Sequence, residues 1–540
     1  MSAPAPAVGA PRCLVRRIEG VLSPSQLYRM HCDGGRRPHT LLLESADPGS
    51  GRTQRSMVML SAALSITGER GGVTVAALNS NGRALLPVLA ARLVGSTVSE
   101  HAGTIRVPVT AARDVSVEHE RLRSPASLDV LRTVTGLLRP GLPDLPESVF
   151  LAGYMAYDLV GQFEELPPPE GGEPDVPDFR FYLADRLVVV DRARHRSEVI
   201  ALVLSGGSDE EQAAREDIVR ITEWASDAVD RAREAADQAG GAGSPPASRP
   251  DPEVDLDDGA FAALVSRLQR HIVAGDVFQI VPSRTFSVPC HDPLAAYEQL
   301  RRRDPVPYLF YLNAGDLILF GASPESSLRV DGPSGTVEIS PIAGTRARGR
   351  GADGRLDPEL DARLEVELRL DVKEQAEHLM LVDLARNDVA RVSRPGTRCV
   401  PELMRIRRYE RVMHLVSRVR GELADGLDAL HACRAVLPMG TLTGAPKRRA
   451  MELLRASEAG YRGLYGGAVG YLLGDGSMDT AIIIRAAVVR GGVARVRAGA
   501  GVVHDSIPLR EAEETRRKAE AVLGAIAAAA ARQPGGSGER

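Results

Sequence analysis

Apolar residues recur along the chain with two different periods, and each period predicts a different kind of element. Short runs rich in Val, Leu and Ile predict strands over 39–45, 72–78, 186–191, 278–288, 317–323, 465–473, 479–489 and 494–503. Segments with apolar residues three and four positions apart predict helices over 258–275, 357–392, 446–457 and 509–532. Many strands follow one another directly in meanders. We therefore expect a mixed α+β fold in which helices cover mainly antiparallel sheets.

A change in composition divides the chain into two parts. Residues 237–253 are rich in Gly, Pro and Ser, and such a stretch cannot continue a helix or a strand. We expect an N-terminal domain over 13–236, a linker or surface loop over 237–253, and a C-terminal domain over 254–531. The two ends, 1–12 and 532–540, are expected to be disordered. A length of 540 residues is enough for two domains.

Composition excludes several classes of protein. A net charge of −4 with scattered arginines argues against a nucleic-acid binder. The longest apolar run, 521–531, is shorter than the roughly 20 residues of a membrane span. The five cysteines are odd in number and form no CxxC pair, which is typical of free thiols in a reducing compartment. With no secretory signal visible, we expect a soluble cytoplasmic protein.

Lysine is rare, and its positions suggest a charged site. Of 67 basic residues only Lys373, Lys447 and Lys518 are lysines, which leaves 67 − 3 = 64 arginines. Lys373 and Lys518 each stand four residues from a glutamate, Glu377 and Glu514, and both pairs could be ordinary surface salt bridges. A compact ammonium is favoured over a planar guanidinium beside a single carboxylate in a tight pocket. The lysines therefore favour two acidic helices near a small anion.

Other polar residues are less specific on their own. The loops 341–351 and 437–454 offer the hydroxyls of Thr345 and Thr441, and no Walker or GxGxxG phosphate motif accompanies them. Glu325 follows a proline at a strand end and is a plausible exposed acid. His414 lies in an apolar alternation, where a histidine is more often a core residue.

Taken in order, many segments closely resemble the large subunits of anthranilate synthases, in the chorismate-utilising enzyme family. Two N-terminal segments, "LLLESAD" and "YDLVGQFEELP", extend the likeness across the chain. The C-terminal segments cover nearly all of 258–530 and are "AGDVFQIVPSR", "PYLFYL", "FGASPESSL", "PIAGTRARG", "KEQAEHLMLVDLARNDVARV", "VMHLVSRVRGEL", "MGTLTGAPKRRAMEL", "YGGAVGY", "MDTAIIIR" and "AGAGVVHDS…EAEETRRKA". The resemblance implies a large α/β sandwich in which two orthogonal sheets enclose the active site.

The resemblance also implies roles for individual residues. Glu377 and Glu514 are similar to the carboxylates that hold Mg²⁺, a cation that prefers oxygen ligands. Glu325 is similar to the acid that protonates the C4 hydroxyl of chorismate, and His414 to the histidine involved in loss of pyruvate. The implied substrate-binding and pocket residues are Thr345, Thr441, Tyr465, Arg485, Gly499, Ala500, Gly501 and Lys518. Lys373 and Lys447 are expected near the pocket without touching substrate.

Two positions indicate the nucleophile. Related isochorismate synthases carry a lysine where this chain has Gln279, and aminodeoxychorismate synthases carry a lysine where it has Ala343. The resemblance then implies that ammonia attacks chorismate and that anthranilate and pyruvate form, as the first step of tryptophan biosynthesis. No glutaminase segment is fused to the chain, so we expect ammonia from a separate glutamine amidotransferase subunit and a hetero-oligomer.

The N-terminal half resembles a feedback site for L-tryptophan. The matching positions are Glu44, Ser45, Arg55, Pro307, Tyr308, Leu309, Gly470 and Tyr471. Three residues depart from the family pattern: Arg55 replaces a lysine, Leu309 a methionine and Asp304 an asparagine.

Two alternatives remain open. The enzyme could stop at 2-amino-2-deoxyisochorismate, against which His414 argues. The chain could also be a non-catalytic tryptophan-sensing subunit, against which the retained Glu325, Glu377, Glu514 and Lys518 argue.

Overall fold

The computed structural model describes residues 11–45, 55–93, 95, 97–99, 103–109, 118–139, 145–204, 207–236, 251–351, 354–409 and 412–531. The predicted disordered ends and linker lie outside these ranges, apart from residues 11, 12 and 251–253. Their disorder and the domain boundaries remain predictions. No helix in these ranges is both long and apolar enough to span a membrane.

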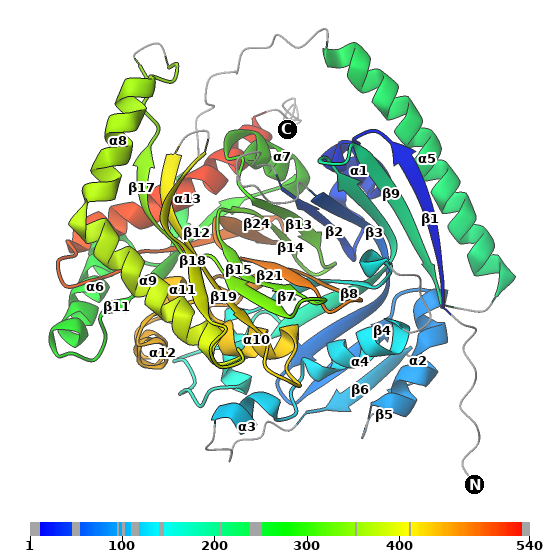
Figure 1. Ribbon diagram of the computed structural model, residues 1–540, viewed down its shortest axis with the longest axis horizontal. Coiled ribbons are helices and arrows are strands. Elements are labelled where there is room, and N and C mark those ends of the chain that lie inside the picture. Colours follow the sequence, from blue (N-terminus) through cyan, green and yellow to red (C-terminus); the bar gives the residue numbers. More distant parts are fainter. Residues whose placement is uncertain are drawn as a thin grey trace, which may run out of the picture.

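The core is an antiparallel sheet network, which confirms the predicted α+β class (Figure 1). Every strand pair is antiparallel, as in meanders and hairpins. The N-terminal strands are β1 (Arg12–Glu19), β2 (Thr40–Glu44), β3 (Arg55–Glu69), β4 (Gly72–Ala77), β5 (Thr97–Ser99), β6 (Thr104–Pro108), β7 (Phe150–Met155), β8 (Phe179–Asp191) and β9 (Arg196–Val203). The C-terminal strands are β10 (Glu253–Val254), β11 (Gln279–Ile280), β12 (Ser283–Pro289), β13 (Tyr308–Asn313), β14 (Ile318–Ser323), β15 (Ser326–Asp331), β16 (Thr336–Ile339), β17 (Ile342–Ala347), β18 (Cys399–Arg408), β19 (Val412–Glu422), β20 (Gly444–Ala445), β21 (Ala468–Leu473), β22 (Met478–Ile482), β23 (Ala486–Arg490) and β24 (Val493–Gly499).

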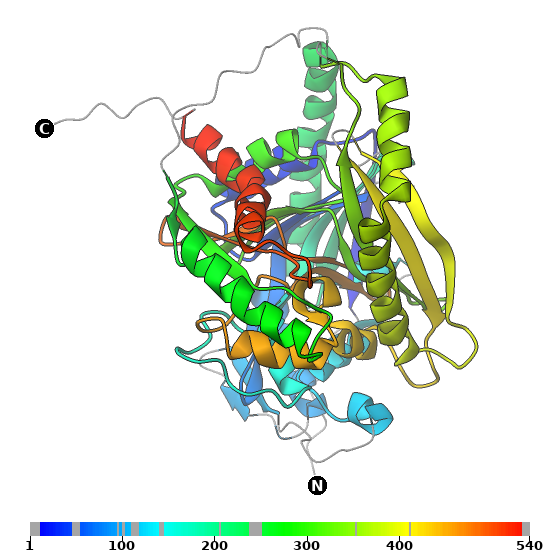
Figure 2. The same ribbon diagram turned by 90° about the vertical axis from the view of Figure 1, so that its left-hand side faces the viewer.

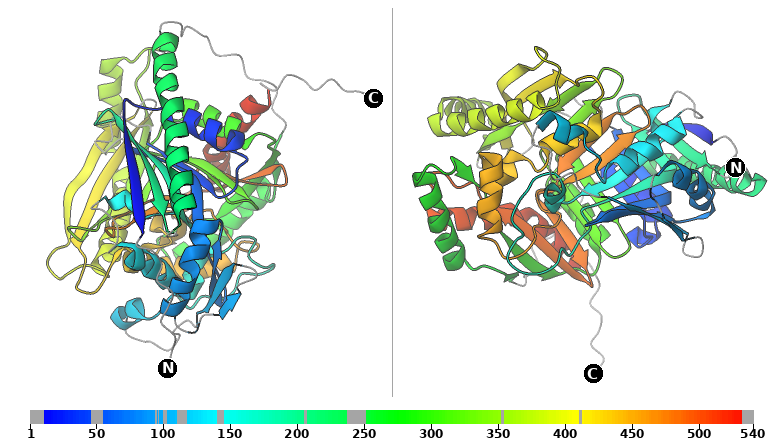
Figure 3. Two further views of the ribbon diagram at one scale, coloured as in Figure 1. Left: turned by 90° about the vertical axis from the view of Figure 1, so that its right-hand side faces the viewer. Right: turned by 90° about the horizontal axis from the view of Figure 1, so that it is seen from below.

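Helices cover the outer faces of this network. The α-helices are α1 (Pro24–His31), α2 (Ser80–Arg92), α3 (Glu118–Arg123), α4 (Asp129–Leu138), α5 (Ser208–Ala236), α6 (Asp258–Val273), α7 (Pro293–Arg303), α8 (Pro358–Leu370), α9 (Val372–Ala390), α10 (Ala429–Val436), α11 (Gly440–Thr443), α12 (Lys447–Arg455) and α13 (Pro508–Ala530). Short 3₁₀ helices are η1 (Asp33–Gly35), η4 (Pro146–Ser148) and η5 (Tyr157–Gln162). Helix α5 runs along the outside of β1 and β9 (Figure 3).

Two long strands, β3 and β8, connect different parts of the sheet. They pair along most of their length, and the register shifts between Met59 and Leu64. Before the shift β3 also pairs with β2, and from Leu64 onward it pairs with β4. Bulges bend and twist a strand, so β3 can pair with β2 at one end and with β4 at the other within the same sheet network.

Strands from the two predicted domains pair directly. Strand β2 lies beside β13, and β7 lies beside β21. The two halves of the chain therefore share one sheet network. A separate small sheet is formed by the two-residue strands β11 and β20.

Two groups of helices lie around the C-terminal strands. Helix α13 packs against α6, α7 and β24, while α9 packs against β17 and β19. In Figure 2, α6 (green) and α13 (red) lie on one side of the view, and α8 and α9 (yellow-green) lie on the other. Glu377 on α9 is nevertheless close enough to Glu511 and Glu514 on α13 for their charges to affect its pKa.

Most predicted elements are confirmed, and three are divided in the structure. Helices α6, α12 and α13 match their predictions within two residues. The predicted helix 357–392 is two helices, because Asp371 is extended and its carboxylate accepts a hydrogen bond from the Glu374 backbone N–H, which caps a new helix. The predicted strand 278–288 separates into β11 and β12. The predicted strand 479–489 separates into β22 and β23, and Arg485 lies in the break.

Candidate active site

Glu325 is a buried acid between β14 and β15. Its backbone carbonyl accepts a hydrogen bond from the Ile482 N–H, which fixes it beside the end of β22. The residue is only 7% exposed, and its Oε1 has no hydrogen-bond partner among the described residues. Burial raises the pKa of Glu325 to about 8, although Thr441, Lys518 and Arg485 each favour the anion. Glu325 therefore carries a proton at neutral pH. The expectation of an exposed acid was wrong, because the folded chain buries this side chain.

Arg485 and His414 line a small cavity together with Pro324, the residue before Glu325. The Arg485 backbone is left-handed, with φ of 47°, and its carbonyl accepts a hydrogen bond from the Ala322 N–H. A left-handed non-glycine residue is strained, and such strain is concentrated at functional sites. Burial, together with the Arg485 charge, lowers the pKa of His414 to about 4. The Thr345 hydroxyl lies 2.9 Å from His414 Nδ1, so this histidine is neutral and held in place at pH 7.

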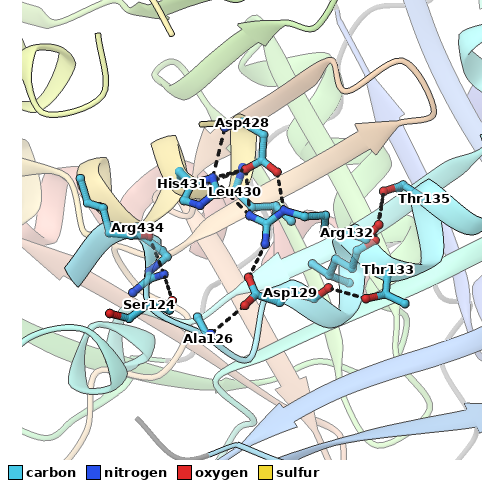
Figure 4. Close-up of polar contacts among 12 residues, drawn as sticks. Ser124, Ala126, Asp129, Arg132, Thr133, Thr135, Asp428, Leu430, His431 and Arg434 are labelled. Carbon is cyan, nitrogen blue, oxygen red and sulfur yellow. Dashed lines mark hydrogen bonds and ion pairs between the residues drawn. The ribbon is translucent and has the colours of Figure 1, made fainter. Parts of the chain in front are cut away.

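Thr441 lies on the short helix α11. The segment that contains α11 begins at the end of α10, and we call it the Thr441 loop. The buried Thr441 Oγ1 lies near the Glu325 carboxyl group and lowers the pKa of that group as a hydrogen-bond donor, and it has no closer partner among the described residues. Figure 4 shows how the N-terminal half holds α10: Arg132 contacts both Asp428 oxygens, at 2.5 and 3.0 Å, and Asp428 caps the helix. Arg434 donates to the Leu122 and Ser124 carbonyls. These contacts position the start of the Thr441 loop.

Lys518 is held by its own helix and by the end of β24. Its Nζ lies 2.8 Å from Glu514 Oε1 and donates to the Gly499 carbonyl at 3.0 Å. Its side chain is 46% exposed, so a ligand can reach the ammonium. The predicted Glu514–Lys518 pair is therefore present beside the predicted glycine-rich strand end.

Carboxylates on α9 and α13 influence one another electrostatically and could hold a cation. Burial raises the pKa of Glu377, and the charges of Glu374, Glu514 and Glu511 raise it further against the opposing effect of Lys373. Neighbouring carboxylates repel one another when both are ionised, and a divalent cation bound between them stabilises their charged forms. Two hard carboxylates fit Mg²⁺, which is typically held by one or two carboxylates plus substrate and water. No ready-made set of three or more His, Cys, Asp or Glu metal ligands occurs in the described ranges.

The segment Gly499–Ala500–Gly501 forms a closely packed backbone surface. A Cβ at Gly499 would lie 2.7 Å from the hydroxyl of Tyr465, and one at Gly501 would lie 2.7 Å from Nε2 of Gln279. Ala500 is fully buried, and its N–H donates to the Pro282 carbonyl. A side chain at position 499 would clash with the Pro282 backbone carbonyl at 2.7 Å as well as with Tyr465, so glycine is required there. At position 501 the nearest atom is the end of the flexible Gln279 side chain, which could move aside.

The other two lysines are explained by local pairs. Lys373 lies 3.7 Å from Glu377, and its side chain is mostly exposed. Lys447 donates to both carboxylate oxygens of Asp388 and to the Val436 carbonyl, so it joins α12 to α9 and the end of α10. All three lysines thus contact a carboxylate.

A second cavity of about 240 Å³ lies between β2, β13 and β21. It is lined by all eight residues predicted for an amino-acid regulator: Glu44, Ser45, Arg55, Pro307, Tyr308, Leu309, Gly470 and Tyr471. Glu44 is 4% exposed, its Oε2 accepts a hydrogen bond from the Tyr297 hydroxyl at 2.6 Å, and it forms an ion pair with Arg301 at 3.0 Å. Glu44 Oε1 has no hydrogen-bond partner within the described part of the chain.

The sequence analysis did not predict a buried network of hydrogen-bonded charged side chains near Tyr465. Glu458 accepts hydrogen bonds from the Ser283 N–H and hydroxyl, from Arg462 and from Arg497. Arg462 also donates to the Leu442 and Val281 carbonyls, so it links the Thr441 loop to the connection between β11 and β12. The i,i+4 spacing of Glu458 and Arg462 was the only available signal, and it is common on surface helices.

Two further contacts were also missed. The Tyr409 ring packs edge-on against His414 at 5.4 Å between centroids. Asp304 Oδ2 lies 3.3 Å from Arg485 Nη1. Asp304 and Arg485 are 181 positions apart, so no local pattern could reveal their ion pair. Tyr409 and His414 are close in sequence, but no pattern there indicated that their rings touch.

Comparisons with known proteins identify the family. Residues 97–524 match the model of the chorismate binding enzymes. The chain is 50% identical to anthranilate synthase component 1, pyocyanine specific, of Pseudomonas aeruginosa, over 91% of this chain and 90% of that protein. It is 47% identical to anthranilate synthase component 1 of Escherichia coli, over 94% of this chain and 95% of that protein.

Solved structures agree with this assignment. Anthranilate synthase component I from Streptococcus pneumoniae superposes with a TM-score of 0.63 at 28% identity, covering 88% of this chain and 92% of that one. The menaquinone-specific isochorismate synthase of Escherichia coli gives a TM-score of 0.61 at 16% identity, covering 97% and 96%, which shows the shared fold alone. This chain belongs to the chorismate-binding enzyme family.

Proposed function

We propose that the chain is the large subunit of an anthranilate synthase and converts chorismate and ammonia to anthranilate, pyruvate and water. The relatives that match it over nine-tenths of their length carry that name. The observation that carries the proposal is Glu325, which is protonated at neutral pH and lies within the electrostatic reach of Lys518 and Arg485. Two nearby cations suit the two carboxylates of a dianionic substrate, and a protonated acid suits a poor leaving group that must be protonated before it departs.

The residues of the chain support each step. Lys518 offers its ammonium to the ring carboxylate, while Arg485 and Tyr465 hold the enolpyruvyl carboxylate. Glu325 donates its proton to the C4 oxygen, the C4–O bond breaks, and water leaves as the nitrogen of ammonia bonds to C2 and the double bonds shift. In the second step neutral His414 accepts the proton that C2 loses, and the C3–O bond breaks. The departing enolpyruvate takes up a proton at its CH2 carbon to become pyruvate, and the ring becomes aromatic. The new ammonium group at C2 returns one proton to Glu325.

Mg²⁺ is the cofactor that the acidic helices favour. Glu377 and Glu514 would hold it, and their crowding of like charge supports this assignment. When bound, the cation would neutralise the substrate's ring carboxylate and draw electron density toward it.

We propose ammonia from a separate glutamine amidotransferase subunit as the nitrogen source, and hence a hetero-oligomer. Gln279 and Ala343 support ammonia, because neither side chain offers an amine nucleophile or a strong base. We also propose that the protein works in the cytoplasm, since all five cysteines are free thiols.

L-Tryptophan is our proposed inhibitor at the 240 Å³ cavity. The free Oε1 of Glu44 suits an α-ammonium group, and the apolar side chains of Leu309, Met57 and Phe310 suit an indole ring. This volume is below the roughly 300–1,000 Å³ of most ligand pockets, so a ligand as small as a single amino acid is a suitable occupant.

Product analysis tests the proposal. The purified chain is incubated with chorismate, Mg²⁺ and ammonium, and anthranilate fluorescence and pyruvate are measured together. Equal amounts of both are expected, and the rate should fall strongly in Glu514→Gln but not in the matched control Glu513→Gln, because Glu513 is exposed on the same helix. An aminated product without pyruvate would identify a 2-amino-2-deoxyisochorismate synthase, and absence of turnover would leave only a tryptophan-sensing role.

A further inference from the structure

Arg485 already has an anionic partner inside the protein. Asp304 Oδ2 lies 3.3 Å from Arg485 Nη1, and both residues line a small cavity of about 20 Å³ together with His414 and Tyr409. The Arg485 charge lowers the pKa of both Glu325 and His414, so its guanidinium acts on the candidate active site. Asp304 therefore places a carboxylate beside the cation that our proposed function assigns to a substrate carboxylate.

The backbone holds both partners firmly. Arg485 is fixed in its left-handed conformation by the hydrogen bond from the Ala322 N–H to its carbonyl. Asp304 is the residue that ends α7, where its N–H donates to the Leu300 carbonyl at 2.8 Å, and Pro305 follows. The Asp304 side chain does not cap the helix, so its carboxylate is available to Arg485.

The ion pair is accessible enough to be exchanged. The side chain of Asp304 is 23% exposed and that of Arg485 is 31% exposed. A fully buried pair would be costly to separate, whereas a partly exposed pair contributes about 0–1 kcal/mol. An incoming carboxylate can therefore replace Asp304 at the guanidinium without a large penalty.

We propose that the Asp304 carboxylate occupies Arg485 in the free enzyme and competes with the substrate's carboxylate for it. This inference rests on the proposed function, because it needs a substrate carboxylate at Arg485. Asp304 is then an internal competitor that lowers substrate affinity. Substrate binding includes the release of Asp304 from the guanidinium.

Chorismate binding by the full chain tests the inference. Isothermal titration calorimetry is run with Mg²⁺ and without any nitrogen donor, so that no aminated product can form. Asp304→Asn removes the charge and keeps the shape, and we expect it to bind chorismate about threefold to fivefold more tightly. Asp304→Glu keeps the carboxylate and is expected to bind no more tightly than the wild type.

A second variant shows whether the effect acts through Arg485. In an Arg485→Gln background, Asp304→Asn should give no gain, because the competitor has nothing left to occupy. In turnover assays the gain should appear in KM and not in kcat, since Asp304 acts on the free enzyme. Thermal unfolding of each variant checks that the fold is retained.

The outcomes separate the inference from the proposed function. If the wild type binds chorismate and Asp304→Asn binds it equally or more weakly, the inference is wrong, and Asp304 instead orients Arg485. A gain of equal size in the Arg485→Gln background would also contradict it, because the effect would then be one of general charge. If the wild type neither binds nor converts chorismate, the proposed function fails and the inference fails with it.

Discussion

Glu325 and Glu44 are two buried carboxylates in different parts of the molecule, and they have different neighbours. Each is less than 10% exposed, and each has an Oε1 atom without a hydrogen-bond partner among the described residues. Glu44 has a counterion and a donor at its other oxygen, Arg301 at 3.0 Å and the Tyr297 hydroxyl at 2.6 Å. Glu325 forms no ion pair in the described part of the chain, and burial raises its pKa to about 8.

The comparison teaches that burial alone does not decide what a carboxylate does. Without a close cation, desolvation favours the neutral acid, which can give a proton to a leaving group. With a cation and a phenol at one oxygen, the anion is supported, and the other oxygen can accept a ligand's ammonium. Two glutamates of similar burial are thus suited to catalysis and to regulation.

The largest effect is expected from removing the acid of the candidate active site, Glu325. Glu325→Gln cannot donate a proton, so kcat with ammonium should fall about 100-fold to 10,000-fold. The matched control is Glu338→Gln, since Glu338 is also buried but is paired with Arg418 and Arg420. Steady-state anthranilate formation measures both, and similar losses would show that the comparison reflects folding and not acid catalysis.

A pH profile sharpens the same difference. Because its pKa is raised to about 8, Glu325 is protonated and active below pH 8 and loses its proton above it. At a fixed concentration of free ammonia, kcat/KM should therefore fall about tenfold per pH unit above pH 8. The profile is measured from pH 6.5 to 9.5. A rate that stays level to pH 9.5 would contradict the assignment of Glu325 as the acid.

The next effect is expected at the second cavity. Glu44→Gln removes the charge that faces an α-ammonium, so the tryptophan concentration for half inhibition should rise about tenfold to 100-fold. Glu298→Gln, a glutamate on α7 that pairs with Arg29 outside the cavity, is the control. Inhibition curves at fixed chorismate give the measurement. Unchanged inhibition in Glu44→Gln would place the regulator elsewhere.

The smallest effect is expected from the phenol that holds Glu44. Tyr297→Phe removes one hydrogen bond to Oε2, so tryptophan inhibition should weaken about threefold. Tyr28→Phe is a close control. Tyr28 packs against the same Tyr311 ring, but its hydroxyl forms a hydrogen bond with Thr40 instead of with Glu44. A loss of equal size in both variants would show that the core around Tyr311, and not the bond to Glu44, sets inhibitor affinity.

Local sequence patterns predicted the fold class and most elements. Helices α6, α12 and α13 follow from apolar spacing, because a helical period places those side chains on one face wherever the helix packs. The eight predicted residues of the second cavity were also found together, since the resemblance covers both halves of the chain. The division of 357–392 at Asp371 was missed because capping competes with an otherwise continuous helical pattern.

The sequence by itself determined which residue types are present: a glutamate after a proline, paired glutamates and lysines on two helices, and a histidine in an apolar strand. Only the tertiary structure decided their states. Glu325 becomes a neutral acid because the fold buries it without an adjacent counterion, and Arg485 acquires Asp304 as a partner because α7 ends beside the break after β22. Charge state depends on solvent exposure and on neighbours that are distant in the chain, and only the folded sheet brings these together.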